Sequence, residues 1–230
     1  MGNYTDYTAT GMDEEDALFL AERDRVDTPP APTDAPTPGF SRFLVEIDGS
    51  AEEYTERLRS LLGAALDRAV AAMDLDHLDD PDSLELDLTV RHVPEWFAAL
   101  CTHSGTEQPA PDFTRAGAAR FTAAGHGSGW RLSGWLERFD WDSTFRTWEW
   151  WDITRTDERT LSIWVNAHGE DFFACDDLRW AAYTSGAVKV TGPVLVDAAE
   201  WRAQRGRAGS GWPPAAAPGS LSAHGRIGEP

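Results

Sequence analysis

The sequence predicts an α+β fold, in which helices pack on a mainly antiparallel sheet of about five to six strands. Three observations favour this class. Several short segments alternate apolar and polar residues, as half-buried strands do. Other segments repeat apolar residues at the helical spacing. Hydrophobic residues make up 41% of the 230 residues, which is enough for the core of a single domain.

Composition divides the chain into three parts. Residues 1–39 are acidic and proline-rich, and we expect a flexible arm in which the apolar run 18–20 can form one or two helical turns. Residues 40–205 contain the strand and helix patterns and form the predicted domain. Residues 206–230 are rich in glycine, proline and alanine, and we expect a loose tail there.

The domain begins with a predicted strand, followed by the clearest helix of the chain. Residues 40–49 alternate apolar side chains in the strand pattern. Residues 50–73 have one apolar helical stripe, and Ser50 with Glu53 has the spacing of a capping box. Residues 84–90 alternate leucine with polar residues, which predicts a half-buried strand.

The middle of the domain is predicted to combine two short helices with three strands. Segments 94–103 and 111–125 have helical signals, namely a proline at the first position of one and a closing glycine in the other. Strands are predicted over 130–138, 146–154 and 160–168. This order of elements suggests a largely antiparallel sheet.

Three more elements complete the predicted domain. Residues 175–186 are expected to form a helix that ends at its closing glycine. Residues 187–196 form the last predicted strand, and the Gly-Pro pair at 192–193 interrupts it, so we expect this strand at a sheet edge. Residues 197–206 are predicted to form a final helix.

The sequence contains eleven tryptophans, and strand alternation indicates which of them share a face of the sheet. If the turn between the last two strands of the middle group has an even length, Trp151 lies opposite Trp164, and Trp150 lies opposite Val165. Trp148 and Trp150 then share a face with aliphatic residues, which is expected to be core.

The opposite face is the candidate binding surface. It collects a row of three tryptophans with carboxylates at its rim, namely Trp135, Trp151 and Trp164 with Glu137 and Glu149. Two alternatives stay open: the helix over 50–73 covers the row, or the row is a partly open aromatic platform. Exposed tryptophans are enriched at interface centres, so the open alternative predicts a binding site.

The charge balance restricts the partners. The formal net charge of −19 at pH 7 opposes binding to nucleic acid and to anionic membranes, and it favours a basic protein surface. Because no apolar run reaches membrane-spanning length and no signal-peptide pattern is present, we expect a soluble, cytoplasmic protein. Lys189 is the sole lysine among 20 lysine and arginine residues, a usage typical of a GC-rich bacterial genome.

No catalytic or metal-binding signature is complete in the sequence. His168, Glu170 and Cys175 contain part of the zinc-deaminase pattern, but the second cysteine pair that this chemistry needs is missing. Cys101 and Cys175 are expected to be free buried thiols and not zinc ligands or a disulfide. We therefore predict no metal and no cofactor.

These observations lead to one functional hypothesis and two alternatives. The leading hypothesis is a non-enzymatic bacterial protein, immunity- or antitoxin-like, that holds a basic protein partner on its acidic, tryptophan-bearing surface. The first alternative is an enzyme that acts on a small molecule or a carbohydrate, using His168 with Glu170 or Asp171. The second is a subunit of a larger bacterial assembly that docks through its flexible ends.

Overall fold

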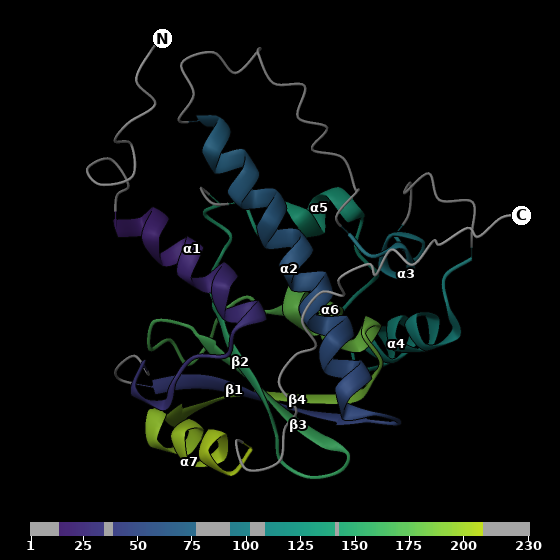
Figure 1. The fold of residues 1–230 in the computed structure, drawn as a ribbon. Helices are drawn as coiled ribbons and strands as arrows, with labels where there is room; N and C mark the ends of the chain where they lie inside the picture. Colours follow the sequence, from purple (N-terminus) through teal and green to yellow (C-terminus); the bar gives the residue numbers. More distant parts are fainter. Residues whose placement is uncertain (1–13, 35–38, 77–92, 102–108, 141–142, 209–230) are drawn as a thin grey trace, which may run out of the picture.

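The chain folds into an α+β domain around one antiparallel sheet, as the computed structural model shows (Figure 1). The structure describes residues 14–34, 39–76, 93–101, 109–140 and 143–208. The sheet has the strand order β2-β3-β1-β4, and its strands are β1 (Gly39–Ile47), β2 (Glu149–Arg155), β3 (Thr160–Asn166) and β4 (Ala187–Asp197).

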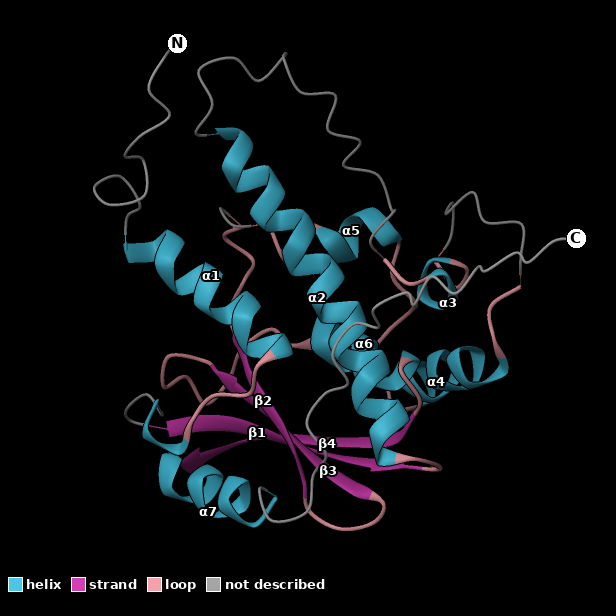
Figure 2. Cartoon of the chain, in the orientation of Figure 1, coloured by secondary structure: helices cyan, strands magenta, loops and turns pink. Residues whose placement is uncertain are grey.

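Helices lie on both sides of this sheet (Figure 2). Helix α7 covers one face, and the larger helical layer, which includes α1, α2 and α6, lies on the other side. The helices are α1 (Glu14–Asp27), α2 (Ala51–Asp76), α3 (Glu95–Ala98), α4 (Asp112–Ala123), α5 (Leu132–Leu136), α6 (Asp176–Thr184) and α7 (Ala198–Ala208), with a short 3₁₀ turn, η1 (Pro32–Asp34).

The class is therefore as predicted, but five to six strands is too many: the sheet formed by the described residues has four. The expected strand over 130–138 is wrong, because α5 occupies Leu132–Leu136. Its apolar residues Leu132, Trp135 and Leu136 are spaced three and four apart, which is the helical period. The expected strand over 84–90 lies outside the described residues.

Helix α2 begins where the predicted capping box lies. The N–H of Glu53 donates to the Ser50 hydroxyl at 3.2 Å, and that hydroxyl donates to the carboxylate of Glu52 at 2.8 Å. The cap thus satisfies one of the free N–H groups of the first turn. The apolar stripe of α2 is buried against the domain core and consists of Tyr54, Leu58, Leu61, Leu62, Ala65, Leu66 and Ala69.

The main core lies between the sheet and the larger helical layer. On the central strand β1, Phe43 and Val45 are fully buried, and they pair with Ile163 and Leu161 of β3. Trp150 of β2 is buried in the same core. Complete burial of an indole stabilises the fold by about 4–6 kcal/mol at most, on the usual area scale.

Of the two predicted pairings between β2 and β3, one is confirmed and the other is wrong. Trp150 pairs with Val165, as expected, but Asp152 and not Trp151 lies opposite Trp164, because a bulge falls between Trp150 and Asp152. A bulge inserts one residue into one strand and redirects the side chains around it. Trp151 therefore joins Trp164 at the α7 face, and not through direct pairing.

A second, smaller core lies beneath α7. Trp201 of α7 packs against Phe40 and Trp151 with ring centroids 5.5 Å and 5.8 Å apart. The indole N–H of Trp201 donates to the buried carboxylate of Asp152 at 3.1 Å. Asp152 also lies 3.7 Å from the Arg59 guanidinium of α2 and 3.8 Å from that of Arg205 in α7. One carboxylate at the bulge thus links the two helical layers.

Strand β4 is at a sheet edge, as predicted, and helix side chains cover part of that edge. The register shifts near the Gly192–Pro193 pair, whose peptide bond is cis. Arg179 of α6 donates to the Gly192 carbonyl at 2.8 Å, and the Tyr183 hydroxyl accepts the N–H of Val190 at 3.2 Å. Satisfying the backbone groups of an edge strand with side chains discourages pairing with another chain.

Within the predicted arm 1–39, where one or two helical turns were expected around residues 18–20, helix α1 covers Glu14–Asp27. Helix α1 packs against α2 and β2. Arg23 of α1 forms ion pairs with Asp67 of α2 and, at 2.6 Å, with Asp27. The apolar side of α1 includes Phe19 and Val26, both in the main core.

The docking ends of the assembly hypothesis lie mostly outside the described residues, which exclude 1–13 and 209–230. Among the helices that the structure describes, none has both the length and the apolar character to cross a membrane.

Candidate functional site

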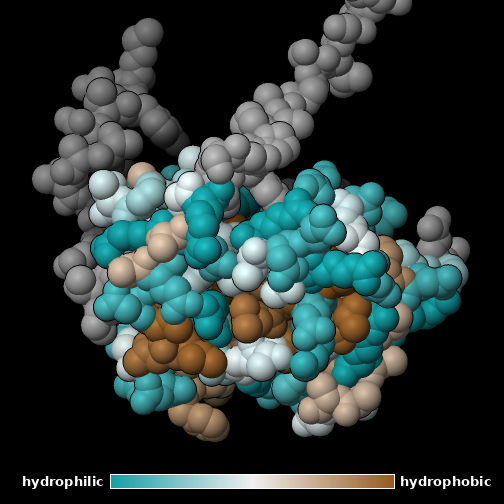
Figure 3. Space-filling view, turned by 90° about the horizontal axis from the view of Figure 1, so that it is seen from below, coloured by the Kyte–Doolittle hydropathy of each residue, from teal (hydrophilic) through white to brown (hydrophobic). Residues whose placement is uncertain are grey.

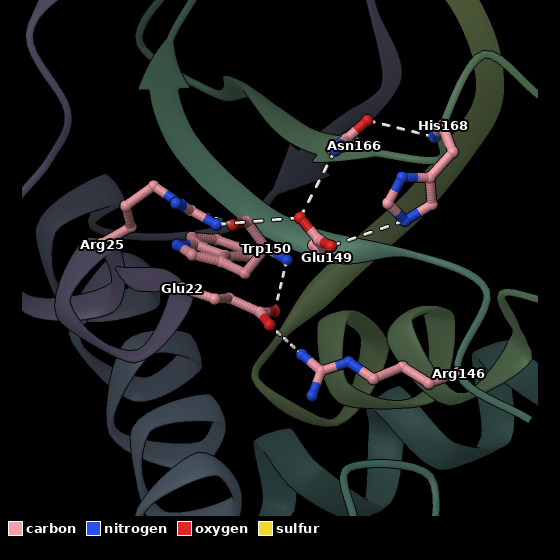
Figure 4. Close-up of polar contacts among 7 residues, drawn as sticks. All are labelled: Glu22, Arg25, Arg146, Glu149, Trp150, Asn166 and His168. Carbon is pink, nitrogen blue, oxygen red and sulfur yellow. Dashed lines mark hydrogen bonds and ion pairs between the residues drawn. The ribbon is translucent and has the colours of Figure 1, made fainter. Parts of the chain in front are cut away.

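A polar cluster lies where α1 meets the outer edge of β2 and the end of β3 (Figure 4). We call it the β2-edge cluster, and its members are Glu22, Arg25, Arg146, Glu149, Trp150, Asn166 and His168. It combines the ion pairs that fasten α1 to the sheet with a mostly buried carboxylate, Glu149, and an exposed histidine, His168. It therefore has a buried inner part and an outward part.

The inner part bonds the backbone of the edge strand. The N–H of Trp150 donates to the Glu22 carboxylate at 2.5 Å, and Arg25 donates to the Trp150 carbonyl at 3.2 Å. Arg146 forms an ion pair with Glu22, and both side chains are almost fully buried. Two residues of one helix thus serve the hydrogen-bonding groups that a neighbouring strand would otherwise serve.

Burial shapes the electrostatics of this inner part. Removal from water raises the pKa of Glu22, while the nearby Arg146 and the Trp150 N–H lower it in part. Burial lowers the pKa of Arg25, which the neighbouring carboxylates Glu22 and Glu149 oppose. The arrangement is a structural ion-pair network. The pKa shifts of Glu22 and Arg25 depend on α1 remaining packed against β2.

The outward part is centred on Glu149. Asn166 donates to its carboxylate at 3.3 Å, and the Nε2 atom of His168 lies 3.5 Å from the same carboxylate. The Arg25 guanidinium lies 3.9 Å from it. The side chain of His168 is 61% exposed, whereas that of Glu149 is 22% exposed. A histidine and a carboxylate in this arrangement can exchange a proton with a group that approaches from solvent.

The backbone holds His168 in place. Its φ angle is 53°, in the left-handed region that residues other than glycine seldom adopt. The N–H of His168 donates to the Asn166 side chain at 3.0 Å, which supports this conformation. Asn166 thus contacts both members of the Glu149–His168 pair.

The structure brings together only some of the residues singled out from the sequence. Glu149 and His168 are neighbours, whereas Glu170 and Asp171 are exposed on the loop after β3 and have no ion pair among the described residues. Glu137 is exposed at the C-terminal end of α5, also without one there. Among the described residues, the carboxylate within ion-pair distance of His168 is thus that of Glu149, and not that of Glu170 or Asp171.

The row of three tryptophans is not an open surface. Trp135, Trp151 and Trp164 are 0%, 6% and 0% exposed. Trp135 lies in α5 and donates its indole N–H to the Asp177 carbonyl at 3.0 Å. Trp151 and Trp164 lie under α7, so the covering helix is not the one expected over 50–73. From the α7 side, hydrophilic residues separate several apolar areas (Figure 3).

Three buried carboxylates, Glu22, Asp152 and Asp177, form several polar contacts each, and the sequence pattern did not indicate this role. Asp177 accepts the indole N–H of Trp148 at 3.1 Å and lies 3.3 Å from Arg138. Burial raises the pKa of Asp152 and of Asp177, while nearby arginines oppose the shift. A carboxylate beside apolar residues in the sequence was the available signal, but it does not distinguish a buried acid from a surface one.

Neither cysteine has the character of a nucleophile. Cys101 and Cys175 are both free and buried, as predicted. Burial raises the pKa of Cys101 to about 12 and that of Cys175 to about 11, so both stay protonated near neutral pH. No group of three or more metal-ligating side chains gathers within the part of the chain that the structure describes.

Comparison with known proteins identifies no family for the chain. No protein-family model matches it, and neither the curated proteins nor the solved structures contain a significant match.

Proposed function

We propose that this chain is a non-enzymatic acidic protein that binds a basic protein partner, as bacterial immunity proteins and antitoxins do. The observation that supports the proposal most directly is how charge is distributed between the interior and the surface. Positive side chains are largely used in contacts within the chain, while many carboxylates face solvent.

Ten arginines have ion pairs within the chain and side chains no more than 27% exposed. They are Arg23, Arg25, Arg42, Arg57, Arg59, Arg68, Arg138, Arg146, Arg179 and Arg205. By contrast, several exposed carboxylates have no ion pair among the described residues, including Asp24, Asp48, Glu56, Glu137, Glu158, Glu170 and Asp171.

The unpaired, exposed carboxylates therefore contribute to the excess of negative charge at the surface. The net charge is −19, and the arginines that reduce it are partly shielded from solvent by their own partners. A basic partner would be steered towards such a surface at low ionic strength, and salt would weaken the attraction.

Affinity capture at two salt concentrations tests the proposal. The tagged full chain is incubated with a bacterial lysate, and captured proteins are identified by mass spectrometry. We expect enrichment of a protein with a basic isoelectric point at low salt and its loss at high salt. The matched control carries glutamine at Glu56, Glu137, Glu158 and Glu170, which lack ion pairs among the described residues, so the fold is kept. Capture of nothing basic by the unmodified chain contradicts the proposal.

A second candidate function is supported by one observation, the 3.5 Å approach of His168 to Glu149 on an exposed loop. In this alternative the pair acts as the acid and base of an enzyme on a small molecule or a carbohydrate. His168→Ala would then abolish turnover but leave binding of a basic protein unchanged. If His168→Ala instead weakens partner capture and no turnover is found in activity screens, the enzymatic alternative fails.

A further inference from the structure

The two most exposed large apolar side chains of the described residues lie on neighbouring loops. Phe172 is 94% exposed and Phe145 is 65% exposed, more than Leu18, Val194 or Leu195. The hydroxyl of Thr147 donates to the Ala174 carbonyl at 2.7 Å and joins the two loops. Each phenylalanine precedes the joined residue of its own loop by two positions, so its Cα lies within about 7 Å of that residue.

The loop that carries Phe172 is anchored to the core. Phe173, the next residue, packs against Phe43 of β1 with ring centroids 6.3 Å apart. The N–H of Glu170 donates to the Ala167 carbonyl at 2.9 Å and closes a turn. Because Phe173 faces inward, its neighbour Phe172 faces solvent from a fixed loop. Its exposure is therefore a property of the fold.

Phe145 is held in a similar way. The guanidinium of Arg138 lies 5.4 Å from the centre of its ring, and Arg138 is itself bound by Asp177 at 3.3 Å. The next residue, Arg146, is tied to Glu22 of α1. The Phe145 ring thus contacts the Arg138 guanidinium and is still largely exposed, so it can contact an apolar group of another molecule.

Two exposed carboxylates are next to Phe172 in the chain. Glu170 and Asp171 immediately precede Phe172, and neither has an ion pair among the described residues. Glu149 contacts the same loop through His168. Single exposed apolar residues are common on protein surfaces, but here two exposed phenylalanines lie on joined, anchored loops, and aromatic residues are enriched in protein interfaces.

We propose that the surface formed by Phe145, Phe172, Glu170 and Asp171 binds a basic segment of a protein partner that also carries an apolar side chain. This inference rests on the proposed function and places the binding site. Charge complementarity selects the occupant: the carboxylates attract arginine or lysine side chains, and the two rings bury an apolar side chain between or beside those cations. Phe145 and Phe172 thus take the anchoring role that the sequence assigned to buried tryptophans.

The test uses the full chain and a fluorescent arginine-rich peptide with one central leucine. A second peptide replaces that leucine with alanine. Variants Phe145→Ser and Phe172→Ser are compared with Val194→Ser, which removes an exposed apolar side chain from β4. Thermal unfolding of each variant checks that it is folded. We expect each phenylalanine variant to bind the leucine peptide about tenfold more weakly, and Val194→Ser to bind it like the unmodified chain.

Each outcome has a distinct meaning. Weaker binding by both phenylalanine variants and by the alanine peptide supports the proposed surface. Equal binding by all variants overturns the location but leaves the proposed function standing, because a basic peptide is still held. Absence of binding to either basic peptide, at low salt and with a folded chain, contradicts the proposed function and the surface together.

Discussion

The backbone N–H of Trp150 donates to the carboxylate of Glu22 at 2.5 Å, although 128 residues separate the two in the chain. This bond and the ion pair of Glu22 with Arg146 fasten the N-terminal helix to the edge of the sheet. A carboxylate thus occupies the position that a neighbouring strand would take.

Removing this carboxylate should strongly destabilise the fold. In Glu22→Ala, the Trp150 N–H and the Arg146 guanidinium lose a buried partner, which costs about 3 kcal/mol of unfolding free energy. Urea denaturation followed by tryptophan fluorescence measures the change. Asp24→Ala is the control, because Asp24 is exposed on the same helix, and we expect a change within about 0.5 kcal/mol. Equal effects of the two substitutions would contradict the role of Glu22.

The pH dependence of stability has a defined sign. Burial raises the pKa of Glu22, so between the unfolded and folded pKa values the folded chain binds more proton than the unfolded chain. The part of the stability that comes from protonation of Glu22 is then full below its unfolded pKa of about 4.3 and is lost as the pH rises through the raised folded pKa.

Glu22→Gln removes this titration and leaves the other buried acids unchanged. We expect the stability of the unmodified chain relative to Glu22→Gln to decrease as the pH increases above about 4.3. Denaturation curves at a series of pH values give this difference directly. A difference that is constant, or that increases with pH, would falsify the assigned direction.

A close approach of two helices depends on one glycine. A Cβ atom added to Gly117 of α4 would lie 1.9 Å from the backbone carbonyl oxygen of Tyr183 in α6. Gly117→Ala must therefore push the helices apart, and we expect a loss of about 3 kcal/mol. Gly134→Ala in α5 is the matched control, since nothing lies within 4 Å of its added Cβ. That control should be neutral or stabilising by up to about 1 kcal/mol. Calorimetric unfolding distinguishes the two results.

The small core beneath α7 depends on Trp201. Trp201→Ala removes its ring contacts with Phe40 and Trp151 and leaves Asp152 without the indole donor, so we expect a loss of about 3–5 kcal/mol. Trp201→Phe keeps most of the packing and should cost about half as much or less. Iodide quenching should increase in Trp201→Ala as Trp151 and Trp164 become accessible. Unchanged stability and quenching in Trp201→Ala would show that α7 does not hold this layer.

Much of the fold was predictable because its periodic patterns are long. The stripe of α2, the alternation of β1 and β3, and the closing glycine of α6 each produce one local structure. The interrupted strand β4 was correctly expected at an edge, because proline cannot donate a backbone hydrogen bond. In these elements local pattern and tertiary packing agree.

The wrong predictions concern a helix that was expected to be a strand and a strand register, and in both a single residue or short segment determines the local structure. The apolar residues at Leu132, Trp135 and Leu136 fit a short helix, but their polar neighbours also fit a strand. The bulge at Trp151 shifts the register by one residue, and no local residue type signals it. Trp135 is not part of the row because it lies in α5, whereas Trp151 and Trp164 do share a face but are buried beneath α7.

The site residues show a related limit. Hydropathy treats Glu22 and Arg146 as surface residues, although they form a buried pair between a distant helix and the sheet. Only the fold brings them together. His168 was singled out from the sequence, but its partner proved to be Glu149, which precedes it in the chain and lies on the neighbouring strand. Sequence proximity to Glu170 was a poor guide to contact.

The most direct measurement of the central claim is the affinity of the full chain for an arginine-rich peptide as salt increases from about 0.05 M to about 0.5 M. If unpaired surface carboxylates hold a basic partner, binding is present at low salt and weakens at least about tenfold over this range. No binding at low salt, or an affinity that does not change with salt, would contradict the account.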